Sequence, residues 1–274
     1  MNFVTLNNGL KMPQLGFGVW QVKDDEATPA VKNAIETGFR SIDTAMIYKN
    51  ERGVGKAISE SNIPREELFI TTKVWNGDQG YEKTLKAFDD SLERLGLNYI
   101  DLYLIHWPTP DFDNYVDTYR AMEKLYKDGR VKAIGVCNFD IDHLQRILDE
   151  CEITPVINQV ECHPFFAQNE LKLFCKKHDI YVEAWSPLMQ GGEVLNHPIV
   201  QGLARDHNKT GAQIIIRWHL QNETIVIPKS VTPSRIEENF SVFDFELTDD
   251  EMEIINNLDR GTRTGAKPSE LHAR

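Results

Sequence analysis

Apolar residues recur along this chain in two alternating patterns. Eight short apolar runs begin near Leu15, Arg40, Leu68, Ile100, Val131, Val156, Tyr181 and Thr224. Runs such as 100–105 and 224–227 are almost continuously apolar, which is typical of parallel strands covered on both faces. The stretches between the runs have helical spacing, with one apolar stripe at Leu85, Phe88, Leu92 and Leu95. The alternation predicts an α/β fold.

The ends of several elements are also marked. Glycines stand where a helix would stop before the next strand, at Gly38, Gly96 and Gly129. Two short runs at 3–6 and 10–12 flank Asn7-Asn8-Gly9, which is a β-hairpin signal. No linker or low-complexity segment interrupts the pattern, so we expect a single domain over residues 1–274.

Eight β/α units in a chain of this length favour a (β/α)₈ TIM barrel over an open doubly wound sheet. The hairpin would then close the bottom of the barrel. The segment 16–21 lacks the third glycine of a dinucleotide-binding fingerprint, and 53–57 lacks the flanking residues of a phosphate-binding P-loop. A helix start is the better interpretation of 53–57.

Composition places the chain among ordinary globular proteins, with 41% hydrophobic and 26% charged residues. No apolar run approaches the roughly 18 residues of a membrane span, and we expect no secretion signal at the N-terminus. The four cysteines, Cys137, Cys151, Cys162 and Cys175, form no C-x-x-C pair. We therefore expect free thiols and a cytoplasmic location.

The net charge is −12, and no basic block interrupts it. This charge argues against nucleic acid and anionic membranes as partners. A phosphate-bearing ligand would need a local basic cluster. The sequence contains no exposed apolar stripe that would argue against a monomer, so we expect a monomer.

In a barrel of this kind the chemistry lies at the C-terminal ends of the strands. Every predicted strand from the second onward ends in a group that can bind or react. In chain order these groups are Asp43 with Tyr48, Lys73 with Trp75, His106 with Trp107, Cys137 with Asn138, Gln159, Trp185-Ser186-Pro187, and Lys229-Ser230. Seven such ends favour a shared site.

Asp43, Tyr48 and Lys73 could form an acid catalyst. A phenol has a pKa of about 10, and lowering it by about 3 units needs about 4 kcal/mol. One ammonium at about 4 Å in a partly screened site supplies about that much, and a carboxylate would hold that ammonium in place. Taken singly, a helix-capping Asp43, a surface Tyr48 and a solvated Lys73 are the likelier interpretations.

His106 precedes Trp107 and Pro108, and the proline biases the strand end toward an extended conformation. A neutral imidazole there can donate a hydrogen bond to a substrate oxygen. His163 lies beside Cys162, but no second ligand pair has metal-site spacing. We therefore predict no metal.

Taken together, these segments resemble the aldo-keto reductase superfamily over essentially the whole chain. The residues that carry the resemblance are 38–45 with Tyr48, 72–75, 101–108, 135–139, 158–164 and 227–230. The short loop after Pro108 and the short C-terminal tail are similar to the bacterial branch that includes diketogluconate and small-aldehyde reductases.

The resemblance implies an NADPH-dependent reductase of aldehydes and ketones. It assigns a catalytic tetrad of Asp43, Tyr48, Lys73 and His106. Hydride passes from the nicotinamide to the carbonyl carbon, and Tyr48 protonates the oxygen as general acid. Lys73, held by Asp43, lowers the pKa of the tyrosine, and His106 orients the carbonyl.

The resemblance also implies the cofactor contacts. Asn138 and Gln159 correspond to the carboxamide site, Trp185 to the nicotinamide ring face, and Lys229, Ser230 and Arg235 to the 2′-phosphate site. Glu238 and Asn239 would lie near the adenine. The remaining expected contacts are Gly18, Val19, Asp43, Cys137, Ser186, Pro187, Leu188 and Val231.

One residue departs from the family pattern. The family commonly has serine where this chain has Cys137. A thiol is a weak hydrogen-bond donor, so one carboxamide contact is expected to weaken. An exposed thiol at this position would also be open to oxidation.

The substrate side is expected to be apolar. Trp20, Trp75 and Trp107 lie at three strand ends and would wall the pocket around Tyr48 and His106. Each tryptophan taken singly is more often a core residue. Short loops predict broad specificity.

Two other functions compete with the reductase. A regulatory NADP(H)-binding sensor on the same fold would keep the nucleotide site with little turnover. A metal-dependent barrel hydrolase would need an H-x-H pair, and the chain has none.

Overall fold

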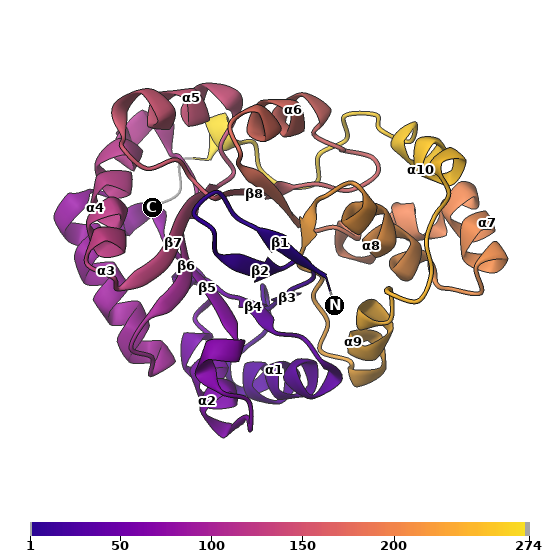
Figure 1. The fold of residues 1–274 in the computed structure, drawn as a ribbon, viewed down its shortest axis with the longest axis horizontal. Helices are drawn as coiled ribbons and strands as arrows, with labels where there is room; N and C mark the ends of the chain where they lie inside the picture. Colours follow the sequence, from indigo (N-terminus) through magenta and orange to yellow (C-terminus); the bar gives the residue numbers. More distant parts are fainter. Residues whose placement is uncertain (1, 272–274) are drawn as a thin grey trace.

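The computed structural model describes residues 2–271. Eight parallel strands form one sheet in the order β10-β9-β8-β7-β6-β5-β4-β3 (Figure 1). Their bounds are β3 Phe17–Gly18, β4 Ser41–Asp43, β5 Phe69–Val74, β6 Ile100–Ile105, β7 Val131–Cys137, β8 Ile157–Glu161, β9 Tyr181–Trp185 and β10 Ile225–Val226. The predicted α/β barrel is confirmed, and each strand begins within two residues of its predicted start.

The sheet curls until its two edge strands meet. Leu15 and Val226 form a parallel bridge between the first and last strands. The backbone N–H of Gly16 donates to the carbonyl of Val226 at 2.9 Å, and that of Gly18 donates to the carbonyl of Pro228 at 3.1 Å. These bonds close the barrel at a seam between β3 and β10.

Helices surround the barrel (Figure 1). They are α1 Asp24–Thr37, α2 Glu51–Glu60, α3 Tyr81–Leu95, α4 Tyr115–Lys127, α5 Ile141–Glu150, α6 Asn169–Lys177, α7 Pro198–Asp206, α8 Gly211–Gln221, α9 Pro233–Phe240 and α10 Asp249–Asn256. The predicted stripe on α3 packs inward, because Phe88, Leu92 and Leu95 are buried. Gly96 ends that helix with a left-handed backbone conformation, φ 64°.

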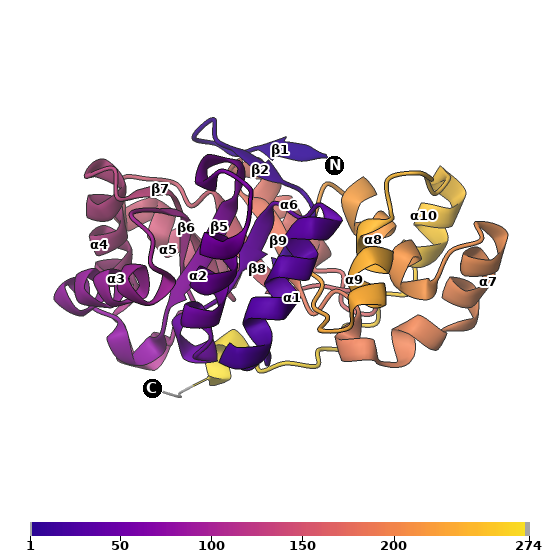
Figure 2. The ribbon, with the colours of Figure 1, turned by 90° about the horizontal axis from the view of Figure 1, so that it is seen from below.

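A two-stranded hairpin, β1 Phe3–Thr5 and β2 Lys11–Pro13, lies across one end of the barrel (Figures 1 and 2). Its turn residue Asn7 donates to the carbonyls of Pro155 and Asp179, which precede β8 and β9. The hairpin therefore covers the N-terminal ends of the strands, as predicted. The short helix η7 Pro268–Glu270 lies at the opposite end (Figure 2).

Two local features differ from the expectation. Tyr48 lies in a short 3₁₀ helix, η1 Met46–Tyr48, that begins three residues after the end of β4. Strand β10 is only two residues long, and Pro228 has no N–H with which to extend it. Within the described residues, no helix is both long and apolar enough to cross a membrane.

Candidate active site

Four side chains converge at the C-terminal ends of neighbouring strands. Asp43 is the last residue of β4, Lys73 lies on β5, His106 follows β6, and Tyr48 comes from η1. Asp43, Lys73 and His106 are buried, and Tyr48 is partly buried. The parallel pairing of β4 with β5 and of β5 with β6 brings these strand ends to one edge.

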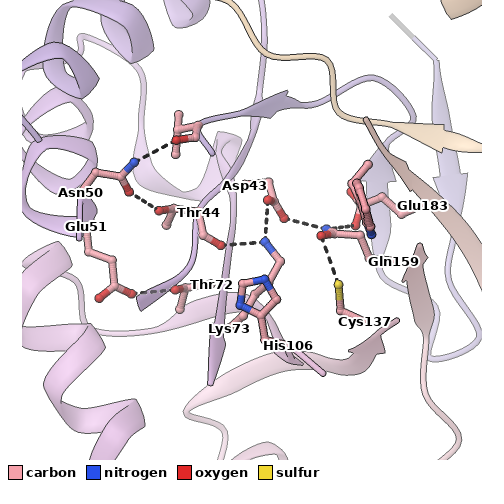
Figure 3. Close-up of polar contacts among 12 residues, drawn as sticks. Asp43, Thr44, Asn50, Glu51, Thr72, Lys73, His106, Cys137, Gln159 and Glu183 are labelled. Carbon is pink, nitrogen blue, oxygen red and sulfur yellow. Dashed lines mark hydrogen bonds and ion pairs between the residues drawn. The ribbon is translucent and has the colours of Figure 1, made fainter. Parts of the chain in front are cut away.

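Lys73 is fully buried and holds an ion pair with Asp43 at 2.6 Å (Figure 3). Its Nζ also donates to the carbonyl of Thr44 at 2.9 Å. Burial by itself lowers the pKa of Lys73, but the Asp43 carboxylate outweighs that cost, so the pKa is raised above its ordinary value. The ammonium keeps its proton.

Tyr48 lies beside the Lys73 ammonium. The Lys73 Nζ lies 5.2 Å from the centre of the Tyr48 ring. Burial raises the pKa of Tyr48, and Lys73 opposes this shift without cancelling it. The expected net lowering is therefore wrong, because losing the hydration of the phenolate outweighs the attraction to the ammonium. At neutral pH the phenol keeps its proton.

His106 completes the group. Its ring lies edge-on to Tyr48 at 5.6 Å and to Trp75 at 5.3 Å between ring centres. Burial, reinforced by the charge of Lys73, lowers the pKa of His106 well below its ordinary value. The imidazole is therefore neutral, and its Nδ1 has no partner among the described residues.

A second network joins the tetrad to the neighbouring strands. The Nε2 of Gln159 donates to Asp43 and to Glu183, each at 2.8 Å. The Cys137 thiol lies 3.5 Å from the Oε1 of Gln159. The amide of Asn138 donates to the His106 carbonyl at 3.0 Å, and its oxygen accepts from the Trp185 indole at 2.8 Å. Gln159 thus uses both of its N–H groups inside the barrel (Figure 3).

Cys137 is a buried thiol with 1% of its surface exposed. It accepts a hydrogen bond from Asn138 Nδ2 at 3.2 Å. Burial raises the pKa of Cys137 well above its ordinary value. Because oxidation follows thiolate character and exposure, the condition for oxidation sensitivity is not met.

The expected phosphate site lies at the start of α9. Lys229 and Arg235 are exposed, and neither has an ion-pair partner within the described residues. Ser230 is buried and accepts from the Thr232 N–H at 3.1 Å, which shapes the turn into the helix. Of the other expected contacts here, Val231 is exposed, Glu238 is half-buried and accepts from the Thr210 hydroxyl, and Asn239 is buried.

The remaining expected cofactor residues lie along the barrel rim. Gly18 and Val19 are buried at the seam, where a side chain on Gly18 would lie 3.0 Å from the Ile227 carbonyl. Ser186 has a left-handed backbone conformation, φ 50°, and its buried hydroxyl has no partner among the described residues. Pro187 is buried and Leu188 half-buried.

The three tryptophans predicted to wall the substrate pocket differ in their exposure. Trp20 is 42% exposed, and Trp75 and Trp107 are half-buried. Trp75 contacts the His106 ring. The Trp107 carbonyl accepts from the Gln79 amide at 2.6 Å, which fixes the backbone beside the histidine.

Sequence reasoning missed several supporting residues. Asn50 donates to the carbonyls of Val19 and Val22 and accepts from the Thr44 hydroxyl at 2.7 Å. Glu51 accepts from Thr72 and from Arg94, each at 2.6 Å. These bonds hold Thr44, whose carbonyl accepts from Lys73, and Thr72, which precedes Lys73 on β5 (Figure 3). Nothing in the local pattern distinguishes them from ordinary helix-start residues.

Two missed residues carried a usable signal, because each is an acid inside an apolar strand. Glu183 interrupts Tyr181–Trp185, and Glu161 ends Ile157–Glu161. Glu161 accepts from the backbone N–H groups of Thr264 at 2.6 Å and Gly265 at 2.9 Å. These bonds hold the C-terminal segment across the strand ends.

Comparison with known proteins identifies the family of this chain. Residues 13–260 match the model of the aldo/keto reductase family. The chain is 55% identical to glyoxal reductase of Bacillus subtilis (98% of this chain, 96% of that protein) and 53% identical to methylglyoxal reductase DkgA of Escherichia coli K12 (98% and 97%). A solved mutant of Gox0644 in complex with NADPH superposes with a TM-score of 0.95 at 47% identity, covering 98% of each chain. The chain belongs to the aldo/keto reductase family.

Proposed function

We propose that this protein reduces small aldehydes and ketones, such as glyoxal and methylglyoxal, to alcohols with NADPH. The observation that carries the proposal is a partly buried phenol that keeps its proton, beside a neutral imidazole and a lysine–aspartate ion pair. The activities named for the two bacterial relatives support the substrate class, and the NADPH bound to the similar solved structure supports the cofactor.

In this mechanism the bound cofactor supplies the hydride that reaches the carbonyl carbon. Tyr48 donates its phenolic proton to the carbonyl oxygen. The Lys73 ammonium, held at 2.6 Å by Asp43, stabilises the phenolate that remains. His106 donates a hydrogen bond that orients the carbonyl. The neutral form of His106 suits this role, because no second positive charge then lies beside Lys73.

The residues present fit the nicotinamide carboxamide. Both N–H groups of Gln159 are taken by Asp43 and Glu183, so Gln159 can only accept a further hydrogen bond through Oε1. The Asn138 oxygen, already bonded to Trp185, keeps a second lone pair. Two acceptors favour an amide NH₂ group as their partner.

The 2′-phosphate would be held by Lys229 and Arg235. On a protein of charge −12, two exposed cations without ion-pair partners in the described chain are a local basic site. Ser230 supplies a hydroxyl beside them. We also propose that the protein works in the cytoplasm as a monomer.

A substrate panel tests the function. Purified protein with fixed NADPH should consume the nucleotide with methylglyoxal, glyoxal and keto-sugars, and the ranking would identify the preferred carbonyl. A sensor on the same fold would bind NADPH and show no steady consumption with any of them. That outcome would overturn the reductase in favour of the sensor.

A further inference from the structure

Glu183 is a buried carboxyl group with an incomplete set of partners. Its side chain lies inside the barrel on β9, paired in register with Gln159 on β8. None of its surface is exposed. Its Oε2 accepts from the Gln159 amide at 2.8 Å, and its Oε1 has no partner in the described part of the chain.

The Gln159 amide group bridges two acids, but only one of them has a cation. Asp43 accepts from the same Nε2 at 2.8 Å and also holds the Lys73 ammonium at 2.6 Å. Glu183 has no ammonium or guanidinium at ion-pair distance within the described residues. A buried acid without a cation, linked through one amide to an ionised acid, retains its proton.

The surroundings of Glu183 agree with this assignment. The ionisable side chains that face it are Asp43 on β4, Lys73 on β5 and Cys137 on β7. Strand β8 adds Gln159 and, two residues further on, Glu161, while β10 places Ile225 opposite Glu183. Burial, followed by the charge of Asp43, raises the pKa of Glu183 to about 8.

We propose that the protonation state of Glu183 sets the charge beneath the nicotinamide half of the site. At neutral pH Glu183 holds a proton and orients the Gln159 amide. When Glu183 loses that proton, the nucleotide preference of the protein shifts from NADPH toward NADP⁺. This inference rests on the proposed cofactor. The oxidised nicotinamide ring carries a positive charge that the reduced ring lacks. At neutral pH the charges of Lys73 and Asp43 cancel, so ionised Glu183 would add an uncompensated negative charge.

The neighbouring groups do not titrate in the same range. The pKa values of Lys73, Tyr48 and Cys137 are raised above their ordinary values, and that of His106 is lowered. Titration of the 2′-phosphate is common to NADP⁺ and NADPH, so it cancels in the ratio of their dissociation constants. A change in that ratio between pH 7 and 9 therefore reports on Glu183.

Two binding measurements test the proposal. From pH 6.5 to 9.5, the Kd of NADP⁺ divided by the Kd of NADPH should fall by about tenfold, which corresponds to a coupling of about one pKa unit. Calorimetry near pH 8, in two buffers of different ionisation enthalpy, should show that NADP⁺ binding releases a fraction of a proton. NADPH binding should release less.

The Glu183→Gln variant should lose both effects, because it keeps an oxygen acceptor for Gln159 but cannot titrate. The matched control is Glu123→Gln, which replaces another buried acid, on α4, that accepts from the Glu152 and Ile153 N–H groups. This control should keep both effects.

A wild-type ratio that does not change with pH, or an unchanged pH dependence in Glu183→Gln, would overturn the proposal. If that variant does not fold, the wild-type proton release decides, since no other group facing Glu183 is placed to supply it. Failure to bind either nucleotide would contradict the proposed cofactor and this inference with it. Binding without turnover would contradict only the proposed reaction.

Discussion

The phenol of Tyr48 and the ammonium of Lys73 are both shifted toward their protonated forms, although they lie in the same buried site. The sequence suggested that Lys73 would make the phenol a stronger acid. Burial instead makes it weaker. A general acid needs its proton before the reaction begins, and this balance ensures that it has one. Lys73 then contributes most at the transition state, when negative charge develops on the phenol oxygen.

Tyr48→Phe should therefore lower turnover by about 10²- to 10⁴-fold, the usual contribution of a general acid. The ring would still fill its place beside His106, so NADPH should bind with little change. Steady-state kinetics with methylglyoxal and direct nucleotide titration would measure the two effects. Unchanged turnover would contradict the acid role.

Arg235→Ala should raise the Michaelis constant for NADPH by about tenfold, because a charge-assisted contact to phosphate is lost. The constant for NADH, which has no 2′-phosphate, should change little. Arg205→Ala, which removes an exposed cation from α7, is the control. Equal effects of Arg235→Ala on both nucleotides would place the phosphate elsewhere.

Glu183 should also make stability depend on pH. Its pKa of about 8 exceeds the ordinary 4.5, so the folded chain binds the extra proton between these values. The stabilisation that Glu183 adds to the free energy of unfolding is complete below pH about 4.5. It falls by a few kcal/mol as the pH rises toward 8. Relative to the wild type, Glu183→Gln should become more stable from pH 5 to pH 8. Chemical denaturation at both pH values measures the difference, and a constant difference would contradict the assignment.

Among the elements, the strands were the most predictable part of the chain. Runs such as Ile100–Ile105 lie between helices and the barrel interior, so their composition alone identifies them. The seam strands were less predictable, because their ends are set by pairing between residues such as Leu15 and Val226. The same limit applies to the site. The tetrad lies at strand ends that a topology rule locates, whereas the partners of Glu183 depend on register across the barrel.

The local sequence pattern predicted least about the C-terminal segment, residues 262–266. It is held by Glu161, which is fully buried and is bonded by Thr264, Gly265 and His163. Burial alone would raise the pKa of Glu161, but these hydrogen bonds lower it to about 2. Gly265 lies directly against Trp185, where a side chain would clash with the indole. Glu161 thereby positions the backbone over the expected nicotinamide-stacking ring.

Glu161→Gln should loosen this segment, because an amide cannot accept from all of these donors. We expect faster amide exchange at residues 262–266 and weaker NADPH binding, by several-fold, with no comparable change in exchange in α3. Hydrogen–deuterium exchange with mass spectrometry measures both regions. Unchanged exchange at 262–266 would mean that other contacts hold the segment.

At the scale of the whole molecule, the barrel is closed at one end by the hairpin and joined at a seam of two very short strands. The sequence indicated eight units and their order, which sufficed to choose a barrel over an open sheet. It did not indicate that the joint between the first and last strands would have the fewest register pairs, a single bridge between Leu15 and Val226. That property arises only when the first and last strands meet.

The seam has a consequence for ligand-linked stability. Gly18 and Val19 lie on one side of it, and Lys229 to Val231 on the other, so a nucleotide bound by both groups would bridge the least-paired joint of the ring. At 100 times its Kd, NADPH should stabilise the protein by about 2.7 kcal/mol. The amides of Gly16, Gly18 and Val226 should gain the most exchange protection, whereas uniform protection around the ring would argue against such a bridge. In the cell, the supply of NADPH would then also affect how long the folded barrel resists proteolysis.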